Sequence, residues 1–158
     1  MNWTLGDYLF AAVSLGSAGA AFAFLFTRSG SMAYRLGCLI GVGTIFLLVW
    51  VNGAVGFIGS SATDANLMYA GVIAVAVGGA CIARFRPLGM GRTMLAAAAA
   101  QVLVALIALA GGLGAGSPNW PLDVILGTAL FTAFWLAAAW LFRRASGASL
   151  VPAAAPIG

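Results

Sequence analysis

Five long apolar stretches separate the charged side chains of this chain, and the sign of the charge changes across each stretch. All seven basic residues are arginines: Arg28, Arg35, Arg84, Arg86, Arg92, Arg143 and Arg144. The three acidic residues are Asp7, Asp64 and Asp123. If each stretch crosses a membrane once, every arginine lies on one side and every aspartate on the other. This alternation constrains the fold more than any other feature of the sequence.

The composition indicates a membrane protein rather than a soluble one. Of the 158 residues, 63% are hydrophobic and 6% are charged, and the mean hydropathy is +1.10. A soluble domain carries about 25% charged residues, so this chain has too few charges to cover a water-facing surface. The net charge of +4 therefore indicates topological anchors at helix ends and not a nucleic-acid-binding surface.

The apolar stretches predict an all-α fold, a single five-helix transmembrane domain over residues 1–144. About 20 residues cross the hydrocarbon core as a helix, and lipid offers no partners for the backbone groups of any open structure. The expected spans are about 8–27, 36–58, 67–83, 93–113 and 122–142. Residues 145–158 are small and interrupted by proline, so we expect a flexible cytoplasmic tail there.

The positive-inside rule orients this bundle. The arginine-bearing loops and the C-terminus are predicted to be cytoplasmic, with the N-terminus outside and the arginines near lipid headgroups. Aromatic residues near the span ends are expected to mark the two interfaces. They are Trp3, Tyr8, Tyr69 and Trp120 on the outer side and Tyr34 and Trp140 on the inner side.

The residue types that are missing exclude most chemistry. The chain has no histidine, lysine or glutamate, and so lacks an imidazole base or metal ligand, a Schiff-base amine and a glutamate or histidine proton relay. We therefore predict no catalytic residue, no metal site and no cofactor. Cys38 and Cys81 fall near the arginine-bearing ends of their spans, where free thiols are expected.

Asn52 lies in the most unusual segment, about six residues before the expected outer end of the second span. It could line a polar pocket open to the outside, with Asp64 and Asn66 above it. Alternatively, it could bond a neighbouring helix, which Gly53 and Gly56 would allow to approach. We expect the second role, because polar side chains commonly hold membrane helices together.

Gln101 is the second amide inside a span, about eight residues into the fourth. Helix packing is again the expected role. If Gln101 and Asn52 faced one cavity, they would instead form a polar path through the bundle.

Small residues recur at four-residue spacing, which lets helix backbones approach closely. The three stripes are Ala12, Gly16 and Ala20; Gly37 and Gly41; and Ala129, Ala133 and Ala137. The spacing does not say whether a stripe packs within one bundle or between chains.

Three segments, WVNGAVGFIG at 50–59, ANLMY at 65–69 and IARFRPLGM at 82–90, resemble a family of small uncharacterised bacterial inner-membrane proteins. The resemblance covers most of the chain and is strongest over 46–110. It implies a bacterial origin and an inner-membrane location, and it implies no activity.

These observations favour a non-enzymatic protein. The leading hypothesis is a small structural or accessory subunit of a larger inner-membrane complex, with an energy-converting complex as one option. The alternative is a homo-oligomeric transporter or channel for a small solute or ion, with Asn52 and Gln101 lining its path. The expected partners are membrane lipids and other integral membrane proteins or further copies of the chain, and not nucleic acid.

Overall fold

The computed structural model describes residues 4–28, 30–54, 56–59 and 64–148, and all regular structure in these ranges is helical. A short 3-10 helix, η1 (Asp64–Leu67), leads directly into the third α-helix. The α-helices are α1 (Leu5–Phe26), α2 (Met32–Ala54), α3 (Met68–Ile82), α4 (Pro87–Ala110) and α5 (Leu122–Ala148). Counting η1 with α3, the five helices are each long and apolar enough to cross a membrane.

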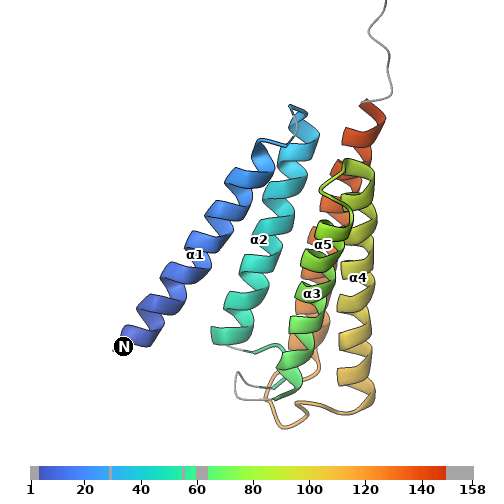
Figure 1. Ribbon diagram of the computed structural model, residues 1–158. Coiled ribbons are helices and arrows are strands. Elements are labelled where there is room, and N and C mark those ends of the chain that lie inside the picture. The colour runs from blue at the N-terminus through green and yellow to red at the C-terminus, as the bar shows by residue number, and fades with distance from the viewer. Residues whose placement is uncertain (1–3, 29, 55, 60–63, 149–158) are drawn as a thin grey trace, which may run out of the picture.

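Successive helices run in opposite directions, as Figure 1 shows. The arginines consequently gather at one end of the bundle, which we name the arginine end. Asp7, Asp64 and Asp123 lie in the first turns of α1, η1 and α5 at the other end, which we name the aspartate end. The structure thus has the predicted five apolar helices and the predicted separation of charge.

Glycine and proline set helix boundaries that differ from the predicted spans. Helix α2 ends at Ala54 rather than near residue 58, because the chain turns at Gly56 and Gly59, where φ is +78° and +76°. Helix α4 begins at Pro87 rather than near residue 93, since proline suits the first helical position. Helix α5 continues past the expected end at 142 to Ala148; residues 149–158 lie outside the described chain.

The main packing contacts connect the helices in the order α1, α2, α5, α4, α3. Helix α4 packs most extensively on α5, and α3 packs mainly on α4. Helix α1 packs mainly on α2 and tilts away from it toward the aspartate end (Figure 1). It is therefore the most exposed helix of the bundle.

The core of the bundle combines large aromatic side chains with small residues opposite them. Trp135 and Phe142 of α5 are completely buried. A Cβ atom at Gly37 would lie 3.1 Å from the Phe142 ring, and one at Gly41 would lie 3.5 Å from Sδ of Met94. The stripe of Gly37 and Gly41 therefore packs inside this bundle, against α5 and α4.

Two of the tyrosines expected at the membrane interfaces lie in the protein core. Tyr34 and Tyr69 are each 1% exposed. The Tyr69 ring packs against Phe57, with 5.2 Å between ring centroids. Trp140, by contrast, is half-exposed beneath the guanidinium of Arg144 at 3.9 Å, an arrangement that suits an interface. Trp3 falls outside the described residues.

Candidate functional site

At the aspartate end, Asn66 organises the turn that follows α2. Its Oδ1 accepts hydrogen bonds from the backbone N–H groups of Phe57 and Ile58, both at 3.0 Å, and its Nδ2 donates to the Ile58 carbonyl at 3.4 Å. All three residues are buried. The side chain thus satisfies backbone groups that left the helix when α2 ended.

Asn52 lies two residues before the end of α2 at Ala54 rather than six, because the helix stops earlier than predicted. It is therefore shallower than expected, about 3 Å from the helix end at 1.5 Å per residue. Its Nδ2 donates to the Leu48 carbonyl of the same helix at 2.9 Å. A Cβ atom at Gly53 would meet the Phe10 ring at 3.6 Å, so the close neighbour there is an α1 side chain.

The polar residues proposed for a pocket have separate tasks in the structure. Asn52 bonds its own helix, Asn66 bonds the 57–58 backbone, and Gly56 supplies the positive φ of the turn. Asp64 is exposed in the first turn of η1, where its charge suits the helix dipole.

Gln101 is fully buried near the middle of α4. Among the described residues, neither its Oε1 nor its Nε2 has a hydrogen-bond partner, and neither do Nε1 of Trp135 and Oγ1 of Thr132 on α5. Gly91 of α4 lies against Ala139 of α5. Because the two helices are antiparallel, Gln101, ten residues after Gly91, lies at about the height of residue 129 of α5. An amide without partners at this depth is costly, by about 1–3 kcal/mol.

The arginines form the rim of the bundle at the arginine end. Arg28, Arg84, Arg86, Arg92, Arg143 and Arg144 are exposed, and Arg35 is half-buried. Three guanidiniums lie over aromatic rings: Arg28 over Phe24 at 4.2 Å, Arg35 over Phe26 at 4.1 Å and Arg144 over Trp140 at 3.9 Å. Such stacking holds the cations at the rim of the bundle.

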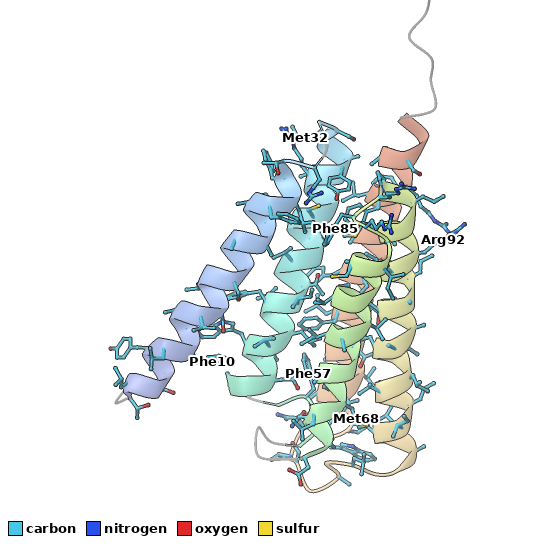
Figure 2. The ribbon with its side chains drawn as sticks, in the orientation of Figure 1. Phe10, Met32, Phe57, Met68, Phe85 and Arg92 are labelled. Atoms are coloured by element: carbon cyan, nitrogen blue, oxygen red, sulfur yellow. The ribbon has the colours of Figure 1, made fainter. Side chains whose placement is uncertain are left out.

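A lateral groove begins beneath this rim, and the sequence pattern does not predict it. Its first cavity, of about 230 Å³, lies between α1, α2 and α3, and Met90, Met94 and Phe142 line it from α4 and α5. Phe85, from the turn after α3, also lines it, and Figure 2 shows this ring near the arginine end. A second cavity, of about 280 Å³, continues between α1 and α2 toward the aspartate end.

The groove arises because α1 diverges from α2 while α2 and α3 pack on different neighbours. Small residues face it where larger ones would fill it: Ala21 on α1, Gly37 and Gly41 on α2, and Ala76 and Ala80 on α3. The small-residue stripe at 37 and 41 lies at this site, as do the two cysteines, Cys38 and Cys81. The stripe could not reveal a groove, since the same spacing also produces closely packed helices.

Comparison of the chain with protein-family models, with curated proteins and with solved structures finds no match. The resemblance to a bacterial inner-membrane family therefore stays a prediction.

Proposed function

We propose that this chain is a non-enzymatic membrane protein, a small structural or accessory subunit of a larger bacterial inner-membrane complex. The observation that carries the proposal is the outward direction of two small-residue stripes. Ala12, Gly16 and Ala20 on α1 are all exposed; on α5, Ala129 and Ala133 are exposed and Ala137 is half-buried.

The α1 stripe supports docking of another membrane helix. A Cβ atom at Gly16, or at the neighbouring Gly19, would meet nothing within 4 Å. Small residues on a membrane helix let a second backbone approach closely, and such residues are enriched where helices pack. Because α1 packs mainly on α2, this outer face of the helix is open to a partner.

The separation of charge supports a multi-pass orientation with the arginine end in the cytoplasm and the N-terminus outside. Each helix exposes large apolar side chains, such as Leu103 and Leu106 on α4 and Leu126 and Leu130 on α5. Such a surface suits hydrocarbon and not water.

The test is purification from native membranes in a gentle detergent, with mass spectrometry of every protein that co-migrates. We expect a different integral membrane protein at fixed stoichiometry. Gly16→Leu should release that protein, because a leucine would hold the two helices apart. Gly71→Leu is the matched control: Gly71 is exposed on α3, also has nothing within 4 Å of its Cβ position, and lies outside both stripes.

A chain that migrates alone as a monomer would refute the subunit proposal. A homo-oligomer would favour the second candidate, a transporter or channel for a small solute or ion, for which the buried and unpartnered Gln101 is the supporting observation. Against this candidate, both cavities of the groove have almost entirely apolar linings. Uptake by proteoliposomes, abolished by Gln101→Leu, would establish it.

A further inference from the structure

We propose that the groove between α1, α2 and α3 binds one acyl chain of an anionic phospholipid, whose headgroup lies on Arg28. The inference rests on the membrane orientation proposed above and is independent of the subunit role. Its support comes from the length, lining, charge and volume of the groove.

The two cavities form one groove of suitable length. They share four lining residues, Ala21, Val42, Ile45 and Val77. On α1 the lining runs from Leu25 near the arginine end to Val13. These two residues are twelve positions apart, which corresponds to about 18 Å at 1.5 Å per residue. One leaflet contributes about 15 Å of the hydrocarbon core, so an acyl chain that starts at the arginine end would follow the groove through one leaflet.

The lining suits hydrocarbon rather than a polar solute. Apolar side chains and glycines make up nearly all of it; the exceptions are two thiols, of Cys38 and Cys81, and two hydroxyls, of Ser14 and Ser17. The Ser17 hydroxyl already donates to the Ser14 carbonyl at 3.1 Å. A polar ligand would lose its hydration here without gaining partners, whereas an acyl chain would gain only dispersion contacts.

Arg28 supplies the charge that selects an anionic headgroup. Its guanidinium carbon lies 4.2 Å from the Phe24 ring centroid and 5.8 Å from that of Phe85. Both rings line the groove at its arginine end, and they pack edge-on with 5.5 Å between centroids. No aspartate or glutamate competes for the cation there, since the chain has only Asp7, Asp64 and Asp123 and all three lie at the other end.

The volume of the groove favours a single acyl chain over a protein occupant. The cavities measure about 230 and 280 Å³ and lie between helices of this chain. An α-helix with its side chains is about 10 Å across, so a second copy or a partner helix could enter only by displacing α1. A single flexible hydrocarbon chain needs no such displacement.

The experiment measures lipid retained by the purified full-length chain after incubation with vesicles of equal parts phosphatidylglycerol and phosphatidylcholine, using native mass spectrometry. We expect one phosphatidylglycerol per chain. Arg28→Gln should weaken its retention about five-fold, the effect of one cation near an anionic headgroup. Arg92→Gln should leave it unchanged, because Arg92 is exposed at the same end and projects away from the groove (Figure 2).

Two further variants fill the groove from different helices, so that failure of one to fold does not end the test. Ala21→Trp on α1 and Val77→Trp on α3 each alter an exposed residue that lines both cavities, and each should abolish retention. Ala23→Trp and Ala74→Trp are matched controls on the same helices, at exposed residues outside either lining.

Three outcomes would overturn the proposal. The first is equal retention of phosphatidylcholine, and the second is equal retention by the filled and control variants, as for lipid that merely surrounds the bundle. The third is occupancy by an isoprenoid quinone in protein taken from native membranes. None of them bears on whether another membrane protein co-purifies with the chain, so this test and the test of the subunit role fail separately.

Discussion

The Tyr34 hydroxyl donates a hydrogen bond of 2.8 Å to the carbonyl of Phe85, joining residues 51 positions apart. Tyr34 belongs to α2, and Phe85 belongs to the turn between α3 and α4. In that turn Arg84 and Phe85 have φ values of +50° and +58°, which residues other than glycine seldom adopt. The hydrogen bond holds this turn against α2 and keeps the Phe85 ring at the end of the groove.

Replacing this hydroxyl should loosen the turn. We expect Tyr34→Phe to lower the free energy of unfolding by about 1 kcal/mol, because the Phe85 carbonyl loses its donor while the ring packing remains. Chemical denaturation in detergent micelles would measure the change. Tyr8→Phe is the comparison, since Tyr8 is 60% exposed; an equal loss for both variants would contradict the special role of Tyr34.

Asn66 should be the most sensitive polar residue at the aspartate end. Asn66→Ala removes the acceptor of two buried backbone N–H groups, at Phe57 and Ile58, and we expect the free energy of unfolding to fall by about 2–4 kcal/mol. Asn119→Ala, at an exposed asparagine of the neighbouring loop, should change it by less than about 0.5 kcal/mol. A small effect of Asn66→Ala in the same unfolding assay would mean that the turn does not depend on this amide.

A side chain at Gly114 should destabilise the protein. Its φ is +83°, and a Cβ atom there would lie 2.6 Å from the backbone nitrogen of Gly59. Gly114→Ala is therefore expected to destabilise the protein by about 1–3 kcal/mol. Gly16→Ala, inside α1 with open space around it, should be neutral or stabilising by up to about 1 kcal/mol. Thermal unfolding of the two variants side by side would test the contrast, and equal midpoints would refute it.

Removing the buried amide of α4 should stabilise the bundle. Within the described part of the chain, neither amide atom of Gln101 has a partner, so Gln101→Leu relieves a desolvation cost and should raise the free energy of unfolding by about 1 kcal/mol. Destabilisation by a similar amount would instead show that the amide is bonded in the native protein.

Asn52→Leu should have little effect on how the helices associate. Among the described residues, the Asn52 side chain makes one hydrogen bond, from Nδ2 to its own helix, and its buried Oδ1 has no partner, so leucine would lose one bond within α2 and remove one unsatisfied acceptor. We therefore expect a change below about 0.5 kcal/mol in the same unfolding assay. A loss of 1 kcal/mol or more would restore the role in helix packing that the sequence suggested.

Prediction of the individual helices succeeded better than prediction of their ends. Apolar length identifies a helix that can cross a membrane, and it located all five. Apolar length misjudged the end of α2 because Gly56 is as apolar as its neighbours. The positive φ of Gly56 nevertheless turns the chain out of the helix. Apolar length also misjudged the start of α4 because Pro87 can either break a helix or begin one, and here it begins one.

The polar residues show why sequence position alone does not define a site. Asn52 and Asn66 resemble each other in the sequence, as amides near the same end of the bundle. The Asn66 side chain accepts hydrogen bonds from the backbone N–H groups of residues 57 and 58, whereas the Asn52 side chain donates to a carbonyl of its own helix. The difference comes from the path of the chain after Gly56, and no hydrophobic pattern encodes that path.

The sequence by itself determined that the chain has five apolar helices, with arginines at one end and aspartates at the other. Hydrophobic length and charge placement are properties of each segment alone, so they can be read before any helix meets another. Only the tertiary structure decided that Gly37 and Gly41 face inward while Gly16 and Ala133 face outward, and that α1 diverges to leave a groove beneath Arg28. Those features depend on which helix packs on which, and helix contacts in a uniformly apolar bundle are chosen by side-chain shape rather than by hydrophobicity.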